Sequence, residues 1–231
     1  MKYKYLYLLG LIFVFLLVSC NREETHSPNK ANVAEEEQED HDHDEHDGHD
    51  HEDEEDTAAL DYTKLDQAIG QVLEETPSFS IQHEVDKGVS GELFNYFNVD
   101  KMAFRLKVES LLGNQAYNSK ELDEYAQYYV NENLLAIEIA KKKYNVEVTQ
   151  AEVTNFIEEN VKEVVPEEKK LYAQSIGVTL EELDNIFDRD IYIMDVLWSK
   201  LTPILMEKYQ QGGGESEAEY MERLTNEFFE A

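Results

Sequence analysis

The sequence predicts an all-α protein, in which a multi-helix module follows a disordered acidic tether. Three observations carry this prediction. From residue 57 onward, apolar residues recur at the three- and four-residue spacing of helices. Three Ser/Thr-x-x-Glu patterns, typical of capping boxes, occur in the same part of the chain. The 231 residues include only four prolines, and no segment shows the sustained apolar–polar alternation that is typical of a strand.

Residues 1–19 are expected to be a lipoprotein signal peptide. Two early lysines precede an almost unbroken apolar run at residues 6–18, which is short for a membrane-spanning helix. The run ends LVSC at residues 17–20, which resembles the lipobox of bacterial lipoproteins. By that resemblance Cys20, the single cysteine, is the lipidation site, carries two acyl chains and becomes the mature N-terminus. The alternative is an ordinary signal peptide or anchor that happens to contain a cysteine.

Residues 20–56 are expected to form a disordered tether. They have almost no apolar content, and residues 35–56 hold 15 carboxylates without a lysine or arginine. Such a segment cannot bury enough apolar surface to offset the entropy lost on ordering. The whole chain carries a formal net charge of −31. This charge argues against nucleic acid as a partner, because affinity for nucleic acid comes from neutralising phosphates.

A histidine-rich stretch, HDHDEHDGHDH at residues 41–51, lies inside this tether. Neutral imidazole suits zinc and nickel, but a structural zinc site needs four ligands that a fold holds in place. The surrounding carboxylates also favour protonated imidazole, which competes with metal. Two interpretations stay open: a solvated acidic spacer, or a weak site for zinc or nickel. No other cofactor is predicted, and the candidate ligands are His41, His43, His46, His49 and His51.

The helical domain is predicted to cover residues 57–211. Its first helix lies within residues 59–75, and a long helix is expected at residues 119–144. One helix or two lie between them, at residues 90–112. The residues expected on the apolar face of that stretch are Leu93, Phe94, Phe97, Met102, Leu106 and Leu111.

The three capping boxes predict where later helices begin. They are the pairs Thr149 and Glu152, Thr179 and Glu182, and Ser216 and Glu219. The second box is expected to start one helix from Leu180 to about Gln211. Three aspartates of that helix, Asp188, Asp190 and Asp195, are expected on a solvated face. Residues 212–231 are expected to be a flexible triglycine linker and a C-terminal helix.

The stretch from residue 121 to 209 resembles the N-terminal domain of the SurA/PrsA group of bacterial extracytoplasmic chaperones. The resemblance is carried by NLLAIEIAK at 133–141, YNVEVTQAEV at 144–153 and IGVTLEEL at 176–183. Two departures stand out. Residues 57–118 show no clear copy of the short strand and V-N-G-type turn that open the domain in that group. Gly212–Gly214 stand where PrsA-like members carry a parvulin prolyl-isomerase domain, which this chain lacks.

The resemblance implies a SurA N-terminal-like chaperone module without the isomerase. The expected function is that of a lipid-anchored protein at the extracytoplasmic face of the cell membrane, which binds unfolded or secreted polypeptides without catalysis. The sequence identifies no client-binding residue. The alternative is a metal-handling lipoprotein that uses its histidine-rich stretch. No catalytic residue is predicted, because no nucleophile–base pair and no glycine-rich phosphate loop stands out in residues 57–231.

Overall fold

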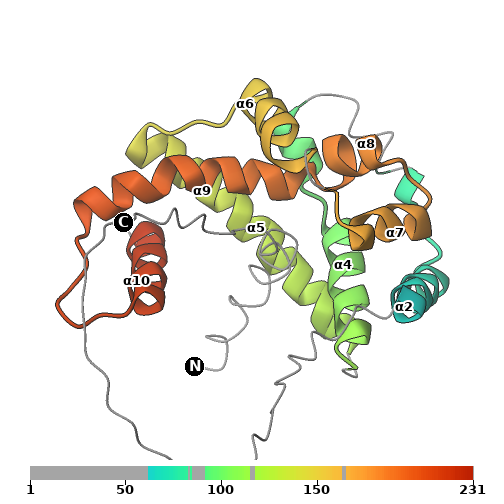
Figure 1. Ribbon diagram of the computed structural model, residues 1–231. Coiled ribbons are helices and arrows are strands. Elements are labelled where there is room, and N and C mark those ends of the chain that lie inside the picture. Colours follow the sequence, from blue (N-terminus) through green and yellow to red (C-terminus); the bar gives the residue numbers. More distant parts are fainter. Residues whose placement is uncertain (1–61, 83, 85–91, 115–117, 163–164, 231) are drawn as a thin grey trace, which may run out of the picture. The chain divides into compact units, whose positions relative to one another are not determined.

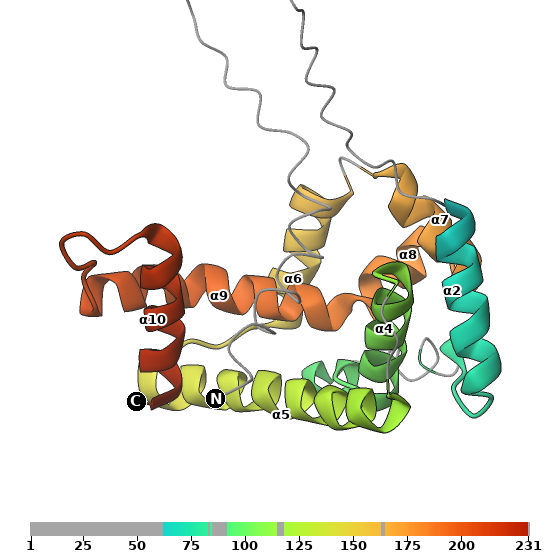
Figure 2. The same cartoon turned by 90° about the horizontal axis from the view of Figure 1, so that it is seen from below.

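The computed structural model describes residues 62–82, 84, 92–114, 118–162 and 165–230 (Figures 1 and 2). All of these lie in one compact unit that spans residues 58–231. The described residues form helices and no strand, which confirms the predicted all-α class. Cys20 and the five histidines of the tether lie outside the described residues.

In the part of the chain that the structure describes, no helix combines the length and the apolar character that crossing a membrane requires.

Eight α-helices and three short helical turns make up the described part of the chain. η1 is a 3₁₀ turn, whereas η2 and η3 are wider π turns. In chain order the elements are α2 (Tyr62–Glu75), η1 (Leu93–Tyr96), α4 (Val99–Leu112), α5 (Ser119–Tyr144), α6 (Gln150–Phe156), η2 (Ile157–Val161), α7 (Glu167–Ile176), α8 (Leu180–Glu182), η3 (Leu183–Phe187), α9 (Arg189–Lys208) and α10 (Glu217–Glu230).

All three predicted capping boxes are present. At the start of α6 the Thr149 hydroxyl accepts a hydrogen bond from the Glu152 amide, and the Glu152 carboxylate accepts one from the Thr149 amide at 2.8 Å. The same reciprocal pairs begin α8 and α10. Each box satisfies amide groups that a helix leaves unpaired at its N-terminus. The helix starts are therefore fixed by local sequence.

The helices pack in a continuous series. α2 lies against α7 and α4, α4 lies against α5, and α9 lies against both α5 and α6. Figure 2 shows α10 standing across α9 and α5, and contacts with both helices agree with that view.

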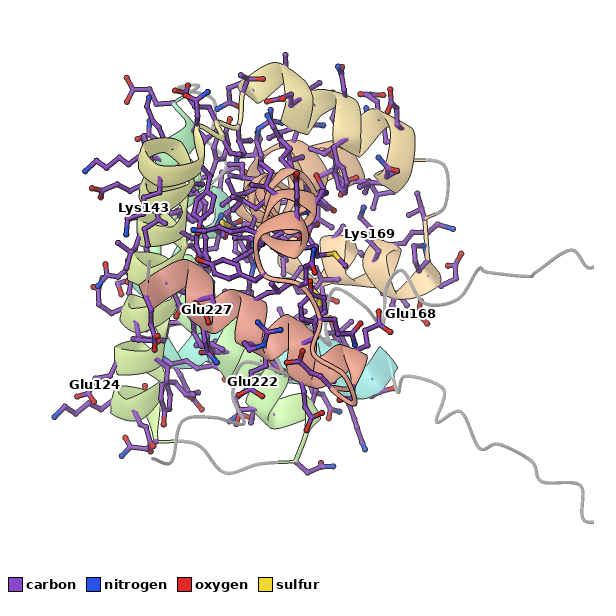
Figure 3. All side chains as sticks on the ribbon, turned by 90° about the vertical axis from the view of Figure 1, so that its left-hand side faces the viewer. Glu124, Lys143, Glu168, Lys169, Glu222 and Glu227 are labelled. Atoms are coloured by element: carbon purple, nitrogen blue, oxygen red, sulfur yellow. The ribbon has the colours of Figure 1, made fainter. Side chains whose placement is uncertain are left out.

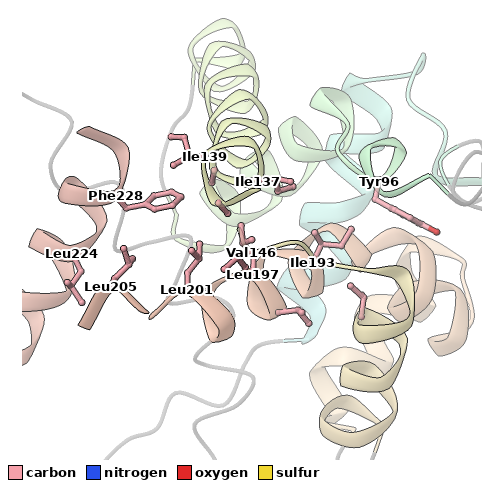
Figure 4. Packing of buried hydrophobic residues seen from close by; sticks show 14 of the residues in the cluster. Tyr96, Ile137, Ile139, Val146, Ile193, Leu197, Leu201, Leu205, Leu224 and Phe228 are labelled. Atoms are coloured by element: carbon pink, nitrogen blue, oxygen red, sulfur yellow. The ribbon is translucent and has the colours of Figure 1, made fainter. Parts of the chain in front are cut away.

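Two apolar cores stabilise this arrangement. The first lies between α5, α6, α9 and α10 (Figure 4). The second lies between α2, α4, α7 and η3. Burying apolar side chains in this way is the main force that holds helices together. The largest fully buried side chains include Ile157, Leu197, Leu201 and Phe228 in the first core, and Ile69, Phe104, Leu183 and Phe187 in the second.

The predicted apolar face of residues 90–112 is correct in part. Leu93, Phe97 and Leu111 are partly buried against the two cores, but Phe94 is 59% exposed. The fully buried side chains of α4 are Lys101, Ala103, Phe104, Lys107 and Val108. A periodicity analysis counts lysine as a solvent-facing residue, so it did not identify this buried face.

The predicted continuous helix after Thr179 is also wrong, because it is interrupted at Asp188. That residue has φ −98° and ψ 5°, and its amide donates to the carbonyl of Leu183, five residues earlier, at 2.7 Å. The Ile191 amide donates to the Asp188 carbonyl at 2.9 Å, which leaves the Phe187 carbonyl free for other donors. α9 begins only at Arg189 and ends at Lys208 instead of Gln211. The bend between η3 and α9 is a central feature of the candidate site.

Candidate functional site

A buried lysine connects α4 to the bend before α9. Lys101 is 2% exposed, and its ammonium group donates to the Tyr96 carbonyl at 2.7 Å, the Phe187 carbonyl at 2.7 Å and the Asp190 carboxylate at 2.8 Å. An ammonium group has three protons to donate. Lys101 therefore uses its full hydrogen-bonding capacity inside the protein.

Arg105, one helical turn after Lys101, binds the same bend. Its guanidinium group donates from Nη1 to Asp190 at 2.8 Å, and from Nη2 to Asp188 and to the Phe187 carbonyl, both at 2.7 Å. Two cations thus face two carboxylates, so the formal charges of this group cancel. We call Lys101, Arg105, Asp188 and Asp190 the ion network.

The electrostatics of the ion network show how strongly its members depend on one another. Burial would raise the pKa of Asp190, but Arg105 and Lys101 lower it below the ordinary value for aspartate. Burial would lower the pKa of Arg105, but Asp190 and Asp188 raise it. For Lys101, burial outweighs Asp190 and lowers the pKa. Asp190 is therefore the carboxylate that both cations share.

Further polar contacts connect the same bend to α7 and α6. Lys169 on α7 pairs with Asp184 in η3, and the Tyr192 hydroxyl donates to Asp184 at 3.0 Å. Arg189, the first residue of α9, donates to the Gln150 carbonyl of α6 at 3.0 Å. Three helices that are distant in sequence, α4, α6 and α7, thus converge on the start of α9.

The expectation that Asp188 and Asp190 lie on a solvated face is therefore wrong. Asp190 is 3% exposed, because α4 brings two cations against it. A sequence signal for this exists: Lys101 and Arg105 are four residues apart and share a helical face with Phe104 and Val108. Every charge of the ion network has its partner within the network. We therefore interpret the ion network as a structural element that holds α4 against the start of α9.

Asp195 differs from these aspartates, since its side-chain carboxylate makes no hydrogen bond or ion pair with any residue that the structure describes. Burial raises its pKa to about 6, above the usual value of about 4 in unfolded chains. Between these two values the folded protein binds the proton more tightly than the unfolded chain does. The free energy of unfolding contributed by Asp195 therefore falls as the pH rises from about 4 to about 6, and the cost persists above that window.

Replacing Asp195 with asparagine should remove this cost. We expect Asp195→Asn to raise the free energy of unfolding by about 1–2 kcal/mol at pH 7.5 and to change it little at pH 4, a magnitude discounted for partial exposure. Urea denaturation at the two pH values measures the difference. Asp66→Asn, at an exposed position on α2, is the control. An equal effect of Asp195→Asn at both pH values would contradict the assignment.

Large apolar side chains that remain exposed form the second part of the candidate site. Tyr128 and Leu135 lie on α5 two helical turns apart, which places them on one face. Ile204 and Met206 lie on α9 on either side of the buried Leu205. The full set of exposed large apolar residues in the described part of the chain is Phe94, Tyr128, Leu135, Ile204, Met206 and Met221.

Three large apolar side chains of α9 differ in burial. Trp198 and Met194 are partly buried against the first core, whereas Met206 is 45% exposed. Among the described residues, no group of three or more His, Cys, Asp or Glu side chains could hold a metal ion. The metal ligands predicted in the tether and the predicted lipidation of Cys20 lie outside the described residues, so both stay predictions.

Comparison of the chain with protein-family models, with curated proteins and with solved structures gives no match.

Proposed function

We propose that the protein is a lipid-anchored, extracytoplasmic chaperone-like protein that binds unfolded or secreted polypeptides and does no chemistry on them. Cys20 carries the anchor at the membrane, the acidic tether spaces the helical unit from the lipid surface, and the helical unit holds the client. The module is proposed to be of the SurA N-terminal type without the isomerase domain.

The observation that carries this proposal is the exposed apolar set. Met206 is 45% exposed and Met221 is 39% exposed. Methionine side chains are flexible and polarisable, so they adapt to apolar partners of different shape. The two methionines lie on α9 and α10, which are packed together. An adaptable apolar surface suits a protein that binds many unfolded chains without sequence preference.

The charged groups of the helical unit support a binding role over catalysis. Four of the buried charged side chains form two ion pairs, Lys101 with Asp190 and Lys169 with Asp184. A catalytic acid or base needs a proton-transfer position that a substrate can reach. These four groups instead connect helices.

The proposal is tested with the chain from residue 20, carrying Cys20→Ser so that it is soluble without lipid. Aggregation of reduced and carboxymethylated α-lactalbumin should be suppressed by this chain. The variant Met206→Ser/Met221→Ser should suppress it several-fold less, with an unchanged helical circular-dichroism spectrum. Full suppression by that variant would contradict the role of these two methionines in client binding.

The metal-handling alternative is favoured by the five clustered histidines in the tether. We expect that replacing all five with serine leaves client holding unchanged and abolishes binding of zinc and nickel by the chain. Zinc binding by the parent chain should be modest, because unordered ligands must first be ordered, and should weaken below about pH 6.5, where imidazole is protonated. If the serine variant still folds and stays anchored but fails to complement a deletion strain, metal handling is the main function.

A further inference from the structure

We infer that α10 is a displaceable strap: it covers an apolar surface of α5 and α9, and an amphipathic helix of the client takes its place. This inference rests on the proposed function, since it adds a covered surface to the exposed residues that are proposed to bind clients.

The contact that holds α10 is a single apolar stripe. Tyr220, Leu224 and Phe228 follow one another at four-residue intervals, and all three are buried. The ring of Phe228 lies 5.7 Å from that of Tyr144 on α5 and 5.2 Å from that of Trp198 on α9. Figure 4 shows the Phe228 side chain pointing away from α10 into this core. One stripe of this kind is the general feature of an amphipathic helix.

The polar bonds of α10 do not attach it to α5. The Tyr220 hydroxyl donates to the Tyr209 carbonyl at 2.8 Å, just after the end of α9. Arg223 donates to the Gln210 carbonyl at 3.0 Å and pairs with Glu215 at 2.8 Å. Among the residues that the structure describes, α10 forms no ion pair with α5 or α9. The Tyr220 hydroxyl also donates to the Met206 carbonyl of α9 at 3.5 Å. The polar contacts of α10 therefore secure the turn before it and the end of α9, whereas apolar packing alone holds its far end.

The turn that precedes α10 can act as a hinge. Gly212–Gly214 lie between α9 and α10, and Gly214 has φ 89°, a conformation that favours glycine. The expected flexible linker is ordered here, because the Gly212 amide donates to Glu215 at 2.9 Å and Glu215 also pairs with Arg223. These bonds lower the pKa of Glu215 to about 2. The side chains of the Arg223–Glu215 pair are 35% and 17% exposed, so opening the triglycine turn requires breaking this partly buried pair together with the bond from Gly212 to Glu215.

The surface that α10 covers can bind many different amphipathic helices. It accepts apolar groups at positions i, i+4 and i+8 of a helix, which many amphipathic segments supply. On α9, next in sequence to the buried Leu205, Ile204 and Met206 are exposed. A client helix can begin to bind at these two side chains and then replace α10. Because α10 is tethered by a short linker, its effective concentration is about millimolar. Weak single-helix ligands are therefore excluded.

A reversible cross-link tests the strap. In the chain from residue 20 with Cys20→Ser, Lys143→Cys and Glu227→Cys place thiols on α5 and α10, each next in sequence to a member of the Tyr144–Phe228 ring contact. Figure 3 labels both parent residues. A bifunctional thiol reagent with an internal disulfide ties α10 down, and reduction releases it. The two single-cysteine chains, treated with the same reagent, are the controls.

The probes are a dye-labelled peptide of residues 216–231 and reduced, carboxymethylated α-lactalbumin. We expect the linked chain to bind both at least about tenfold more weakly than the unlinked chain, with binding restored by reduction. Equal binding by linked and unlinked chains would overturn the strap and leave the proposed function intact. Peptide binding that appears only in a dimer would overturn it too, since the occupant would then be α10 of a second copy. Failure of every form to bind α-lactalbumin would refute the proposed function itself.

Discussion

Replacing Asp190 with alanine is expected to lower the free energy of unfolding by about 3–5 kcal/mol, because removing one partner of a buried ion pair leaves the other charge uncompensated. Two cations lose their shared carboxylate in this variant, since Lys101 and Arg105 both donate to Asp190 at 2.8 Å. Neither cation can regain full hydration without moving α4 away from the bend. Urea denaturation of the chain from residue 20 measures the change.

The control for Asp190→Ala is an exposed ion pair. Lys120 and Glu124 on α5 pair at 3.6 Å, with side chains 85% and 70% exposed. Such pairs contribute about 0–1 kcal/mol, so Glu124→Ala should change the free energy of unfolding by less than about 0.5 kcal/mol. If Asp190→Ala destabilised the protein no more than Glu124→Ala does, the ion network would not be what fixes the bend.

Replacing Phe187 with alanine should also cost about 3–5 kcal/mol, the usual range for truncating a buried phenylalanine. Phe187 is fully buried in the second core. Its ring lies 6.2 Å from that of Phe104 in an edge-to-face contact, and the guanidinium carbon of Arg105 lies 5.3 Å from the ring centroid. The substitution removes apolar packing and a cation–π contact together.

Phe94→Ala is the matched control for this substitution. The same atoms are removed, but Phe94 is 59% exposed, so the free energy of unfolding should change by less than about 0.5 kcal/mol. Similar losses from Phe94→Ala and Phe187→Ala in thermal or urea denaturation would mean that the two side chains are not buried as the structure shows.

Features encoded within a few residues were predictable from the sequence. The capping boxes at Thr149, Thr179 and Ser216 depend on groups three residues apart, and all three are present. The long helix at residues 119–144 has the predicted bounds and carries three lysines in its last turn, where positive charge stabilises a helix. Such features need no knowledge of the rest of the fold.

The ion network was not predicted because it depends on tertiary structure. Lys101 and Asp190 are 89 positions apart in the chain, and a charged residue is assigned to the surface unless its partner is known. For the same reason the buried face of α4, which includes Lys101 and Lys107, was not recognised. The exposed apolar residues were also beyond prediction, because Met206 and Trp198 have similar apolar character in the sequence and differ only in what packs on them.

Site-specific photo-cross-linking tests the central claim, client binding at the exposed Met206 of α9, most directly. A photoreactive amino acid is placed at Met206, and in a separate chain at Glu159, an exposed position on η2. Each chain is then irradiated with radiolabelled, reduced and carboxymethylated α-lactalbumin. The account predicts a cross-linked product at position 206 that is several-fold stronger than at position 159. Equal labelling at both positions, or none at position 206, would contradict it.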